Sequence, residues 1–422
     1  MTEHARQAQG DTRKRIAVIG AGVVGLATAL RLQRDGRAVV LFDPEPPGSQ
    51  TSSGNAALIM TAQISPLSQP GLWKKVPAML LDPKGPLVVR WQYLPRLAPW
   101  FLQFLANSTW KTYERIAVAL TPLVTRSLDA WLELMGPGKG AHHFRKDGLL
   151  YVFRKPENFE AARAEAAFRA RYGIPSEIIP SEELKQMEPE LAPGLAGGLL
   201  YPESAHTVEP LHLSAALLEA FLAAGGVVRR ERVERLIPDH GKLRVVTAAG
   251  GTVFDHSVVS AGVWSLPLVA PLSVRPRMTA ERGYHLMLPE PGVALRRPIG
   301  AGDDKFIITP LATGVRLAGT AEFASIEAEP DWRRSDILLP LAQRLVPGLQ
   351  NGKAQRWMGR RPSTPDSLPI IGRVRGVPQV ICAFGHGHLG LTLAAVTSEI
   401  VSDLIAGKPE PASLPAFSPY RF

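Results

Sequence analysis

The stretch IAVIGAGVVGLATALRLQRDGRAVVLFD, residues 16–43, decides the fold. It begins with a short apolar run that is typical of a buried strand. A glycine-containing turn follows, and apolar residues then recur with helical spacing as far as Gly36, a common helix stop. A second apolar run ends at Asp43. Strand, turn, helix and strand in this order predict the start of a parallel α/β sheet.

Gly20, Gly22 and Gly25 have the spacing of the fingerprint that binds dinucleotides. The first glycine permits a tight turn, the second lets the backbone approach a pyrophosphate, and the third allows close packing of helix against strand. The first helical turn, which contains Val23 and Val24, would offer free N–H groups to the phosphates.

Asp43 supports the same interpretation, because a carboxylate at the end of the second strand accepts hydrogen bonds from an adenosine ribose. Its charge would also repel a 2′-phosphate. A bound dinucleotide is therefore predicted in preference to a purely structural glycine turn. The fingerprint alone does not separate NAD from FAD.

The composition bounds the class of protein. The chain has 422 residues, of which 45% are hydrophobic and 20% charged, so it has the composition of a globular protein and the length for two domains. Cys382 is the single cysteine, which excludes a disulfide within the chain and a zinc finger. Residues 1–14 are polar and charged, so we expect a disordered tail there and no secretory signal.

The formal net charge is +10, but the lysine and arginine residues are scattered and form no nucleic-acid recognition motif. We interpret this charge as a solvated basic surface that attracts anionic ligands, and we expect no nucleic-acid partner. No transmembrane helix is expected, and the cytoplasm is the expected location.

Two kinds of segment alternate along the chain. Residues 148–154 and 227–237 each have the pattern of one strand, and residues 156–173 and 331–347 each have the pattern of one helix. Extended segments at 282–288, 305–309 and 314–321, joined by turn residues, predict an antiparallel sheet. Dinucleotide-type elements occur at both ends and in the middle, so two interleaved domains are expected.

Four further segments resemble the FAD-dependent D-amino acid oxidase (DAO) family of amine oxidoreductases. They are TSSGNAALI (51–59), VVSAGVWS (258–265), GRRPSTPDSLPIIG (359–372) and GHGHLGLTLAA (385–395). The resemblance covers nearly the whole chain from about residue 15. ERGYHL (281–286) and the 70–100 stretch are most similar to the branch of bacterial D-amino acid and D-hydroxyproline dehydrogenases.

The resemblance implies an α/β fold in which a Rossmann-like FAD-binding domain is interleaved with an antiparallel-sheet α+β substrate domain. The expected FAD-binding segments are 15–75, 200–270 and 355–422, and the expected substrate-binding segments are 76–199 and 271–354. FAD would be bound non-covalently, because Met358 and Gly359 stand near the position where sarcosine oxidases carry their flavin-linked cysteine.

Beyond the fingerprint residues, the resemblance assigns cofactor contact to residues of the four segments and one position between them. These are Ser52, Ser53, Asn55, Ala56, Val233, Gly262, Gly359, Gly385, His386, Gly387, His388, Leu389, Gly390 and Thr392.

The segment like GHGHLG lies beside the flavin pyrimidine edge in this family, where N–H groups at a helix start stabilise the charge of the reduced flavin. His386 and His388 are then flavin-side or packing residues, and an acid–base role for His388 is an alternative. A His-x-His spacing also suits a metal, but no third and fourth ligands cluster nearby, so no metal is predicted.

Arg361 matches the arginine that holds the substrate carboxylate in glycine and D-amino acid oxidases. A guanidinium binds a carboxylate through two parallel hydrogen bonds, which suits this role. Because adjacent side chains on a strand point to opposite sides, Arg360 is expected to point away. The alternative for Arg361 is a surface salt bridge.

The same alternation places Tyr284 and His285 on opposite faces of one strand. We expect Tyr284 to line the substrate cavity and to act with Arg361 and His388 as a catalytic residue. Its alternative is a core tyrosine. Asp304 and Phe306 on the next strand are weaker candidates for the cavity.

The leading functional hypothesis is oxidation of the Cα–N bond of a D-amino acid to an imine by hydride transfer to flavin N5, with D-proline and cis-4-hydroxy-D-proline as candidate substrates. A quinone or an electron-transfer protein is the expected acceptor. The alternatives are a glycine or sarcosine oxidase that produces hydrogen peroxide, a flavin-binding subunit of an electron-transfer dehydrogenase, and a plain NAD-binding protein.

The Trp-rich stretch 70–104 is interpreted as a cover of the active site, with peripheral contact to the inner membrane as its alternative.

Overall fold

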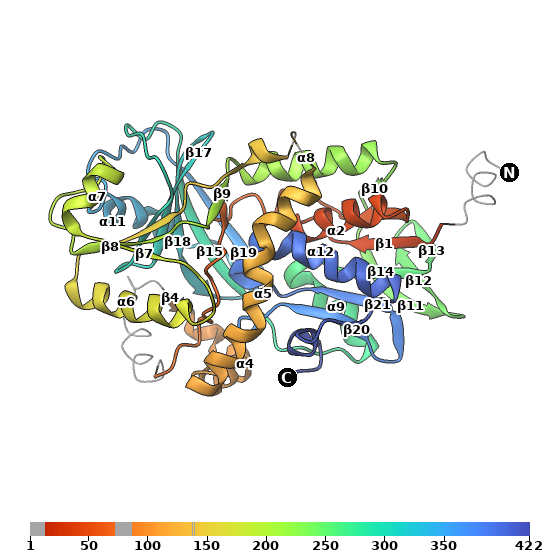
Figure 1. The fold of residues 1–422 in the computed structure, drawn as a ribbon. Coiled ribbons are helices and arrows are strands. Elements are labelled where there is room, and N and C mark those ends of the chain that lie inside the picture. The colour runs from red at the N-terminus through yellow and green to blue at the C-terminus, as the bar shows by residue number, and fades with distance from the viewer. Residues whose placement is uncertain (1–12, 72–86, 137, 139) are drawn as a thin grey trace.

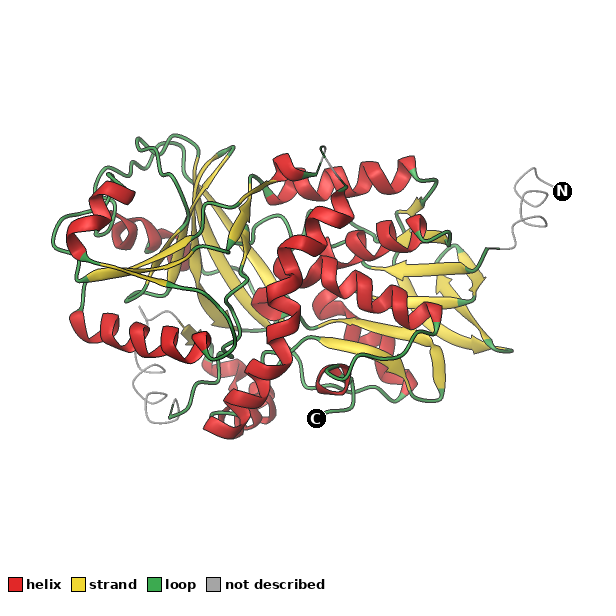
Figure 2. Cartoon of the chain, in the orientation of Figure 1, coloured by secondary structure: helices red, strands yellow, loops and turns green. Residues whose placement is uncertain are grey.

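The computed structural model describes residues 13–71, 87–136, 138 and 140–422, and the strands of these residues form four sheets. Figure 1 shows the two large sheets in separate halves of the molecule, with the long helix α5 (Trp110–Met135) crossing between them. The secondary-structure colouring of Figure 2 shows helices packed around both halves.

One half is built on a six-stranded sheet. Every neighbouring pair in it is parallel except the last, β21–β20. Numbered by chain order within this sheet, the strands β10, β2, β1 and β14 are the third, second, first and fourth. The strand order therefore reverses between β1 and β14, which is where open α/β sheets bind ligands. The strands, in spatial order, are β10 (Val227–Arg229), β2 (Ala38–Phe42), β1 (Arg15–Ile19), β14 (His256–Val259), β21 (Val377–Phe384) and β20 (Ile370–Val374).

Both faces of this sheet are buried, as a parallel sheet requires. Ile16 and Val18 of β1 pack in one hydrophobic cluster, whereas Ala17 and Ile19 pack in another on the opposite face. The first cluster includes side chains of α5 and of α2 (Val23–Arg34), α8 (Pro210–Ala223) and α12 (Gly390–Ala406). The second includes α9 (Ser265–Val269) and the three-stranded sheet β11 (Val233–Asp239), β12 (Lys242–Thr247) and β13 (Gly250–Phe254).

The other half is built on a nine-stranded sheet that is largely antiparallel. One face of it packs on α7 (Ser181–Met187) and α11 (Leu338–Gln343). Its strands, in spatial order, are β19 (Gln355–Ser363), β15 (Thr279–Leu288), β18 (Gly314–Phe323), β17 (Phe306–Leu311), β16 (Ile299–Ala301), β6 (Leu149–Phe153), β8 (Gly197–Tyr201) and β7 (Glu177–Ile179), and β4 (Leu87–Val89) pairs with β18.

The remaining elements complete the surface and the link between the halves. They are α4 (Leu94–Ala106), α6 (Pro156–Ala170), α10 (Arg333–Asp336) and the small sheet of β3 (Leu58–Ile59), β9 (Ala205–Thr207) and β5 (Phe144–Arg145).

The expected fold class is confirmed, because strands from widely separated parts of the chain alternate between the two large sheets. Two local predictions are wrong. Residues 227–237 form two strands, β10 and β11, in different sheets, and residues 331–347 form two short helices, α10 and α11. Arg230, Glu231 and Arg232 lie between the two strands and belong to neither, so the chain passes there from one sheet to the next.

Two other expectations concern the domain limits and the ends of described segments. Strand β19 starts the last expected FAD-binding segment, yet it pairs with β15 in the nine-stranded sheet, so the domain limits stay a prediction. Residues 1–12 of the expected tail and residues 72–86 of the Trp-rich stretch lie outside the described residues.

Among the residues that the structure describes, one helix, Gly387–Ala406, is long and apolar enough to cross a bilayer. Its apolar window is 72% buried within the protein, and α12 packs in the same hydrophobic cluster as α2 and α5. These contacts identify it as a core helix.

Candidate active site

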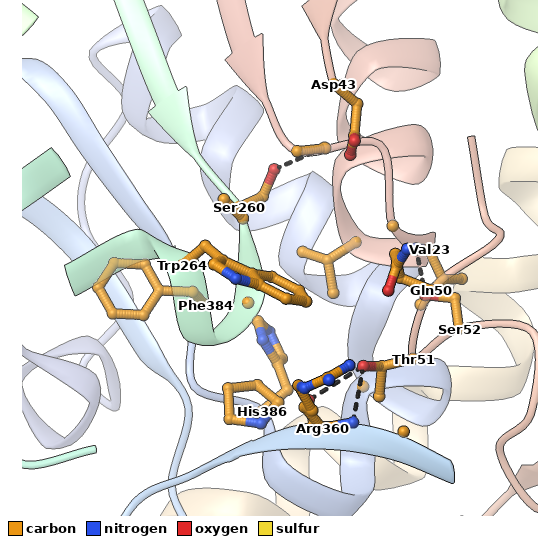
Figure 3. Close-up of a pocket in the computed structure, with 18 of the residues that line it drawn as sticks. Val23, Asp43, Gln50, Thr51, Ser52, Ser260, Trp264, Arg360, Phe384 and His386 are labelled. Atoms are coloured by element: carbon orange, nitrogen blue, oxygen red, sulfur yellow. Dashed lines mark hydrogen bonds between the residues drawn. The ribbon is translucent and has the colours of Figure 1, made fainter. Parts of the chain in front are cut away.

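A cavity of about 630 Å³ opens at the point where the strand order reverses. Its lining comes from the ends of β1, β2 and β14, from β19, from the loop at 50–56 and from the start of α12. Figure 3 shows Asp43 at one end of this cavity and Arg360 and His386 at the other, with Val23 and Ser52 at the side between them. The cavity is therefore elongated and joins segments that are far apart in the sequence.

The turn after β1 requires glycine at two positions. Gly20 has a φ of +102°, and a Cβ there would lie 2.6 Å from the carbonyl oxygen of Ser260. A Cβ on Gly25 would lie 1.8 Å from the carbonyl oxygen of Gly20, so α2 can pack on the turn only with glycine at this position. Gly25 has this packing position and does not line the cavity.

The N-terminus of α2 forms part of the cavity wall, to which Gly22, Val23 and Val24 contribute. Gly22 is the N-cap residue and supplies no capping side chain, and the first turn contains no acidic residue. The N–H of Val23 donates to the Ser52 hydroxyl at 2.9 Å, as the dashed line in Figure 3 shows. A helix start without an acidic side chain retains its positive electrostatic end, which suits a phosphate group.

Asp43 is fixed by the backbone at the far end of the cavity. Its Oδ2 accepts from the N–H of Ala21 at 2.7 Å, and its Oδ1 accepts from the N–H of Glu45 at 2.8 Å. Burial raises the pKa of Asp43, and the two backbone hydrogen bonds oppose that rise. Each oxygen keeps a lone pair for a ligand, as binding of a ribose diol requires.

The loop at 50–56 is held to the second half of the molecule. The Thr51 hydroxyl donates to the Arg360 carbonyl at 3.0 Å and accepts from the Arg360 N–H at 3.2 Å (Figure 3). Buried Arg316 donates to the carbonyl of Asn55 at 2.8 Å and pairs with Glu209 at 3.1 Å. These bonds fix the wall between the two large sheets.

The opposite end of the cavity is formed by the turn before α12. Gly385 and Gly387 have φ values of +76° and +51°, which favour glycine. His386 is buried, and its Nε2 lies 3.0 Å from the Thr397 hydroxyl. Burial lowers the pKa of His386 to about 3, so this imidazole is neutral at physiological pH.

Arg361, Glu281 and His388 meet at this end of the cavity. Nη1 of Arg361 donates to Oε1 of Glu281 at 2.9 Å, and Nε2 of His388 lies 2.8 Å from the same oxygen. The Ser363 hydroxyl donates to Oε2 of Glu281 at 2.9 Å. Arg361 and His388 line the cavity, whereas the Glu281 side chain is only 3% exposed behind them.

The electrostatics of this cluster keep Glu281 ionised. Burial alone would raise the pKa of Glu281, but the neighbouring His388 and Arg361 and the hydrogen bond from Ser363 together hold it well below its usual range. A buried carboxylate is stable in this state only with such partners.

Gly283 makes room for the Arg361 guanidinium. The two residues are on adjacent antiparallel strands, and a Cβ on Gly283 would lie 2.2 Å from Cζ of Arg361. The guanidinium therefore lies across the backbone of β15 at Gly283, and a side chain on any other residue at this position would displace it.

The structure corrects the expectation for Tyr284. Its hydroxyl donates to Oε2 of Glu322 at 2.6 Å and accepts from the N–H of Asp331 at 3.1 Å, and Tyr284 does not line the cavity. Burial raises its pKa to about 12. Tyr284 is a core tyrosine with a satisfied hydroxyl because its position on β15 points it to the face opposite Glu281.

His285 is on the same face of β15 as Glu281 and stacks on Trp357, with 4.8 Å between ring centroids. Its Nδ1 lies 2.9 Å from the Gly54 carbonyl oxygen, and burial lowers its pKa to about 3. The candidates on the neighbouring chain segment are also placed elsewhere: Asp304 pairs with Arg154, and Phe306 is buried in the core of the nine-stranded sheet.

The structure brings most of the expected site residues to this one cavity. Besides Tyr284, the exceptions are Gly25, Ser53, Leu389 and Thr392. The residues that line it are Gly20, Gly22, Val23, Val24, Asp43, Ser52, Asn55, Ala56, Val233, Gly262, Gly359, Arg361, Gly385, His386, Gly387, His388 and Gly390.

Sequence reasoning missed Glu281, Trp357 and Trp264. Trp357 and Trp264 line the cavity, and Glu281 pairs with two residues that do. The sequence signal for Glu281 was its place two residues before Gly283 on a strand, which puts it on the face opposite Tyr284. Trp357 likewise lies on the same face of β19 as Gly359 and Arg361, because the three residues are spaced two apart on the strand.

The described part of the chain contains no group of three or more His, Cys, Asp or Glu side chains arranged to hold a metal ion. Cys382 is fully buried in β21 away from the cavity lining, and burial raises its pKa to about 12. Cys382 is therefore not among the side chains that a ligand in the cavity would meet.

The family model described as FAD dependent oxidoreductase matches residues 15–404. A D-amino-acid oxidase of Bradyrhizobium diazoefficiens is 36% identical over 97% of this chain and 99% of its own length. A D-amino acid dehydrogenase of Paramagnetospirillum magneticum is 32% identical over the same shares of the two chains. The crystal structure of glycine oxidase from Geobacillus kaustophilus covers 97% of this chain and 100% of its own with a TM-score of 0.73 at 23% identity, a likeness of fold.

Proposed function

The chain belongs to the FAD-dependent oxidoreductase family, and from that premise we propose that it oxidises the Cα–N bond of a D-amino acid to an imine. The observation that carries this proposal is the position of Arg361, whose guanidinium lines the cofactor cavity at the end formed by the start of α12. The names of the two similar enzymes support a D-amino acid as the substrate class.

The cavity fits FAD on three observations. Asp43 stands at one end with free lone pairs for a ribose, and the N-terminus of α2, whose first turn holds no acidic residue, lies beside the cavity for the pyrophosphate. At the other end the turn at 385–390 lines the cavity before a second helix start, and its N–H groups would stabilise negative charge on a flavin there. Bound FAD supplies an acceptor for the hydride that leaves the substrate. Burial of Cys382 supports non-covalent binding.

Arg361 would bind and orient the substrate. Only its Nη1 is engaged by Glu281, which leaves further N–H donors of the guanidinium for the carboxylate of an amino acid. Fixing the carboxylate fixes the direction of the Cα–H bond, and such alignment contributes several kcal/mol to lowering a barrier. Arg360 also lines the cavity, but its Nε donates to the Ile326 carbonyl at 2.8 Å, and alternation on β19 places its side chain on the face opposite Arg361.

His388 would accept the proton of the substrate ammonium group. The amine of an amino acid is protonated at neutral pH and must lose one proton before Cα–H can leave as a hydride. His388 lines the same end of the cavity as Arg361, and both approach one oxygen of Glu281. The N–H bond of the substrate breaks, a new N–H bond forms on the imidazole, and the lone pair left on nitrogen assists departure of the hydride.

The imine would hydrolyse to a keto acid, or persist in cyclic form if the amine is part of a ring. D-Proline and cis-4-hydroxy-D-proline are therefore substrates to test alongside acyclic D-amino acids. The experiment is anaerobic mixing of the purified flavoprotein with D- and L-amino acids, glycine and sarcosine while the oxidised flavin absorbance is followed. Bleaching by D-amino acids supports the proposal, and bleaching confined to glycine and sarcosine would replace it with the amine oxidase alternative.

The electron acceptor is decided by readmitting air. Slow recovery of the oxidised spectrum would indicate a dehydrogenase that uses a quinone or an electron-transfer protein, whereas rapid recovery with hydrogen peroxide would indicate an oxidase. Copurification with a partner that carries iron–sulfur cysteines would indicate the subunit alternative.

Peripheral membrane contact is supported by exposed apolar side chains at α4. Trp91 is 79% exposed just before α4, Leu102 on α4 is 67% exposed, and Trp110 at the start of α5 is 64% exposed. The inner side of the same helix reaches the site, because Nε1 of Trp100 donates to the Ser363 carbonyl at 3.0 Å. An apolar outer face next to a redox site suits access to a membrane quinone.

Sedimentation with anionic phospholipid vesicles tests this contact. The double variant Trp91→Ala/Leu102→Ala should lose vesicle binding. The matched control is Leu211→Ala/Leu222→Ala on α8, where two exposed leucines are removed from another surface. Equal vesicle binding by both variants and the unaltered protein would contradict the proposed contact. The expectation for the protein would then be a cytoplasmic location without membrane contact.

A further inference from the structure

We propose that Glu281 is a positioning residue that couples carboxylate binding at Arg361 to proton acceptance at His388. One oxygen, Oε1, contacts both partners, at 2.9 Å and 2.8 Å. The inference rests on the proposed function and deepens it, because it states how the charge of the substrate site is set. Glu281 itself is 2% exposed and lies outside the cavity lining, so it acts through its two neighbours.

The contact with Glu281 fixes the proton arrangement of His388. Glu281 is ionised, and an unprotonated nitrogen 2.8 Å from a carboxylate oxygen would be repelled by it. Nε2 therefore carries a hydrogen, and in the neutral imidazole Nδ1 becomes the acceptor. Among the hydrogen bonds of the described residues none engages this Nδ1, and the His388 side chain is 39% exposed toward the cavity. When Nδ1 takes the substrate proton, Glu281 stabilises the imidazolium that forms.

The contact of Glu281 with Arg361 fixes the geometry of the guanidinium but reduces the net positive charge that a substrate carboxylate meets. Glu281 holds Nη1, and Gly283 leaves space beneath the guanidinium, so the remaining donors are oriented before substrate arrives. The negative charge of Glu281 offsets that of Arg361, so an anion meets a weaker positive field than an unpaired arginine would provide. Glu281 thus lowers ground-state affinity for carboxylates while it favours the proton transfer that precedes oxidation.

The other charged groups near the cluster do not share this role. Arg360 and Arg282 lie on the opposite face of the same two strands, where Arg282 approaches Glu322 at 3.3 Å. His285 is stacked on Trp357 and is neutral because burial lowers its pKa to about 3. Within the described part of the chain, Glu281 is the one carboxylate in ion-pair contact with Arg361 or His388.

The variant Glu281→Gln tests the proposal, because the amide oxygen can still accept from Arg361 and His388 while the amide N–H₂ faces Ser363. Two quantities are measured with FAD bound. The first is the Kd of propionate, a carboxylate without an amine, followed by perturbation of the flavin spectrum. The second is the rate constant of anaerobic flavin reduction by the best amino acid substrate.

The two quantities should change in opposite senses. Propionate should bind more tightly, by up to about tenfold, because the charge of Arg361 is no longer offset. Flavin reduction should slow by about tenfold or more, because the imidazolium loses its partner. A residue with a purely structural role would weaken both.

Ser363→Ala is the matched control, since it removes the hydrogen bond to Oε2 and leaves the charge of Glu281 in place. It should not tighten propionate binding. Glu281→Asp is the second test variant: it keeps the charge but shortens the side chain, so reduction should slow without tighter propionate binding. It also serves if Glu281→Gln does not retain FAD.

Weaker propionate binding together with slower reduction in Glu281→Gln would overturn the proposal, and so would an unchanged reduction rate in either Glu281 variant. These outcomes are distinct from failure of the proposed function. That failure would appear in the unaltered protein, as no reduction by any amino acid, whereas propionate binding requires no turnover.

Discussion

Arg361 and Glu281 are register partners on the antiparallel strands β19 and β15, and their side chains meet on the cavity side with 2.9 Å between Nη1 and Oε1. The pairing places a buried carboxylate directly behind the arginine that is proposed to bind substrate. It follows that the arginine is held in place before any ligand binds, and its affinity for anions depends on an acid that the substrate does not touch.

Replacing Arg361 with alanine should raise the KM for an amino acid by about 10²-fold, because a charge-assisted hydrogen-bonded pair worth about 2–3 kcal/mol is lost. Steady-state kinetics on the FAD-bound protein measures this. Arg360→Ala is the matched control, since its side chain donates to the Ile326 carbonyl on the other face of β19. Equal effects of the two substitutions would refute the assignment of the carboxylate site.

Replacing Gly283 with alanine should weaken propionate binding by about tenfold, because the new Cβ would occupy space 2.2 Å from Cζ of Arg361 and displace the guanidinium from its oriented position. FAD content should be unaffected, since Gly283 does not line the cavity. Spectral titration with propionate measures the first quantity. Unchanged propionate binding in an FAD-replete variant would show that the guanidinium does not need this position.

Replacing Asp43 with alanine should weaken FAD binding by about tenfold or more. The N–H groups of Ala21 and Glu45 would lose the carboxylate that accepts their hydrogen bonds, and the ribose hydroxyls would lose the same acceptor. Fluorescence titration of the apoprotein with FAD measures this change. The rate constant of reduction in the FAD-saturated variant should stay near that of the unaltered protein, since Asp43 is at the far end of the cavity. A large loss of that rate constant would contradict the proposed orientation of FAD.

Stability against unfolding should fall as the pH decreases from about 6.5 towards 4. Burial lowers the pKa of His206 to about 4 and the pKa values of His285 and His386 to about 3, so the unfolded chain binds protons in this window that the folded protein does not. Each such histidine lowers the free energy of unfolding by about 1.4 kcal/mol for every pH unit below the pKa that it has in the unfolded chain.

The test is the dependence of Tm on pH for His386→Asn, whose decline should be shallower than that of the unaltered protein. His240→Asn, which changes an exposed histidine on a turn, should leave the decline as it was. A steeper or equal decline for His386→Asn would show that this histidine does not take up its proton on unfolding.

The cofactor half was predictable because its signals are local. The strand, the glycine turn, the helix and Asp43 lie within residues 16–43, and the structure builds β1, α2 and β2 from them. The same local pattern indicated that Gly20, Gly22 and Asp43 reach the cavity, because each follows closely on the end of a parallel strand.

The substrate end was only partly predictable because it depends on register between distant strands. Alternation on β15 indicated that Tyr284 and His285 face opposite ways, but it did not say which face meets the cavity. The pairing of β15 with β19 decides this, and it brings Glu281 to Arg361 across 80 residues of chain. The sequence of one strand contains no information about that partner.

The most direct test of the account is the anaerobic reduction of bound FAD by the two enantiomers of one amino acid, with proline as the first pair. The account predicts that D-proline or another D-amino acid bleaches the oxidised flavin band with a rate that saturates with concentration, that its L-enantiomer does not, and that Arg361→Ala requires far more substrate. Absence of bleaching by every amino acid tested, in protein that holds FAD, would contradict the proposed reaction and the role given to Arg361.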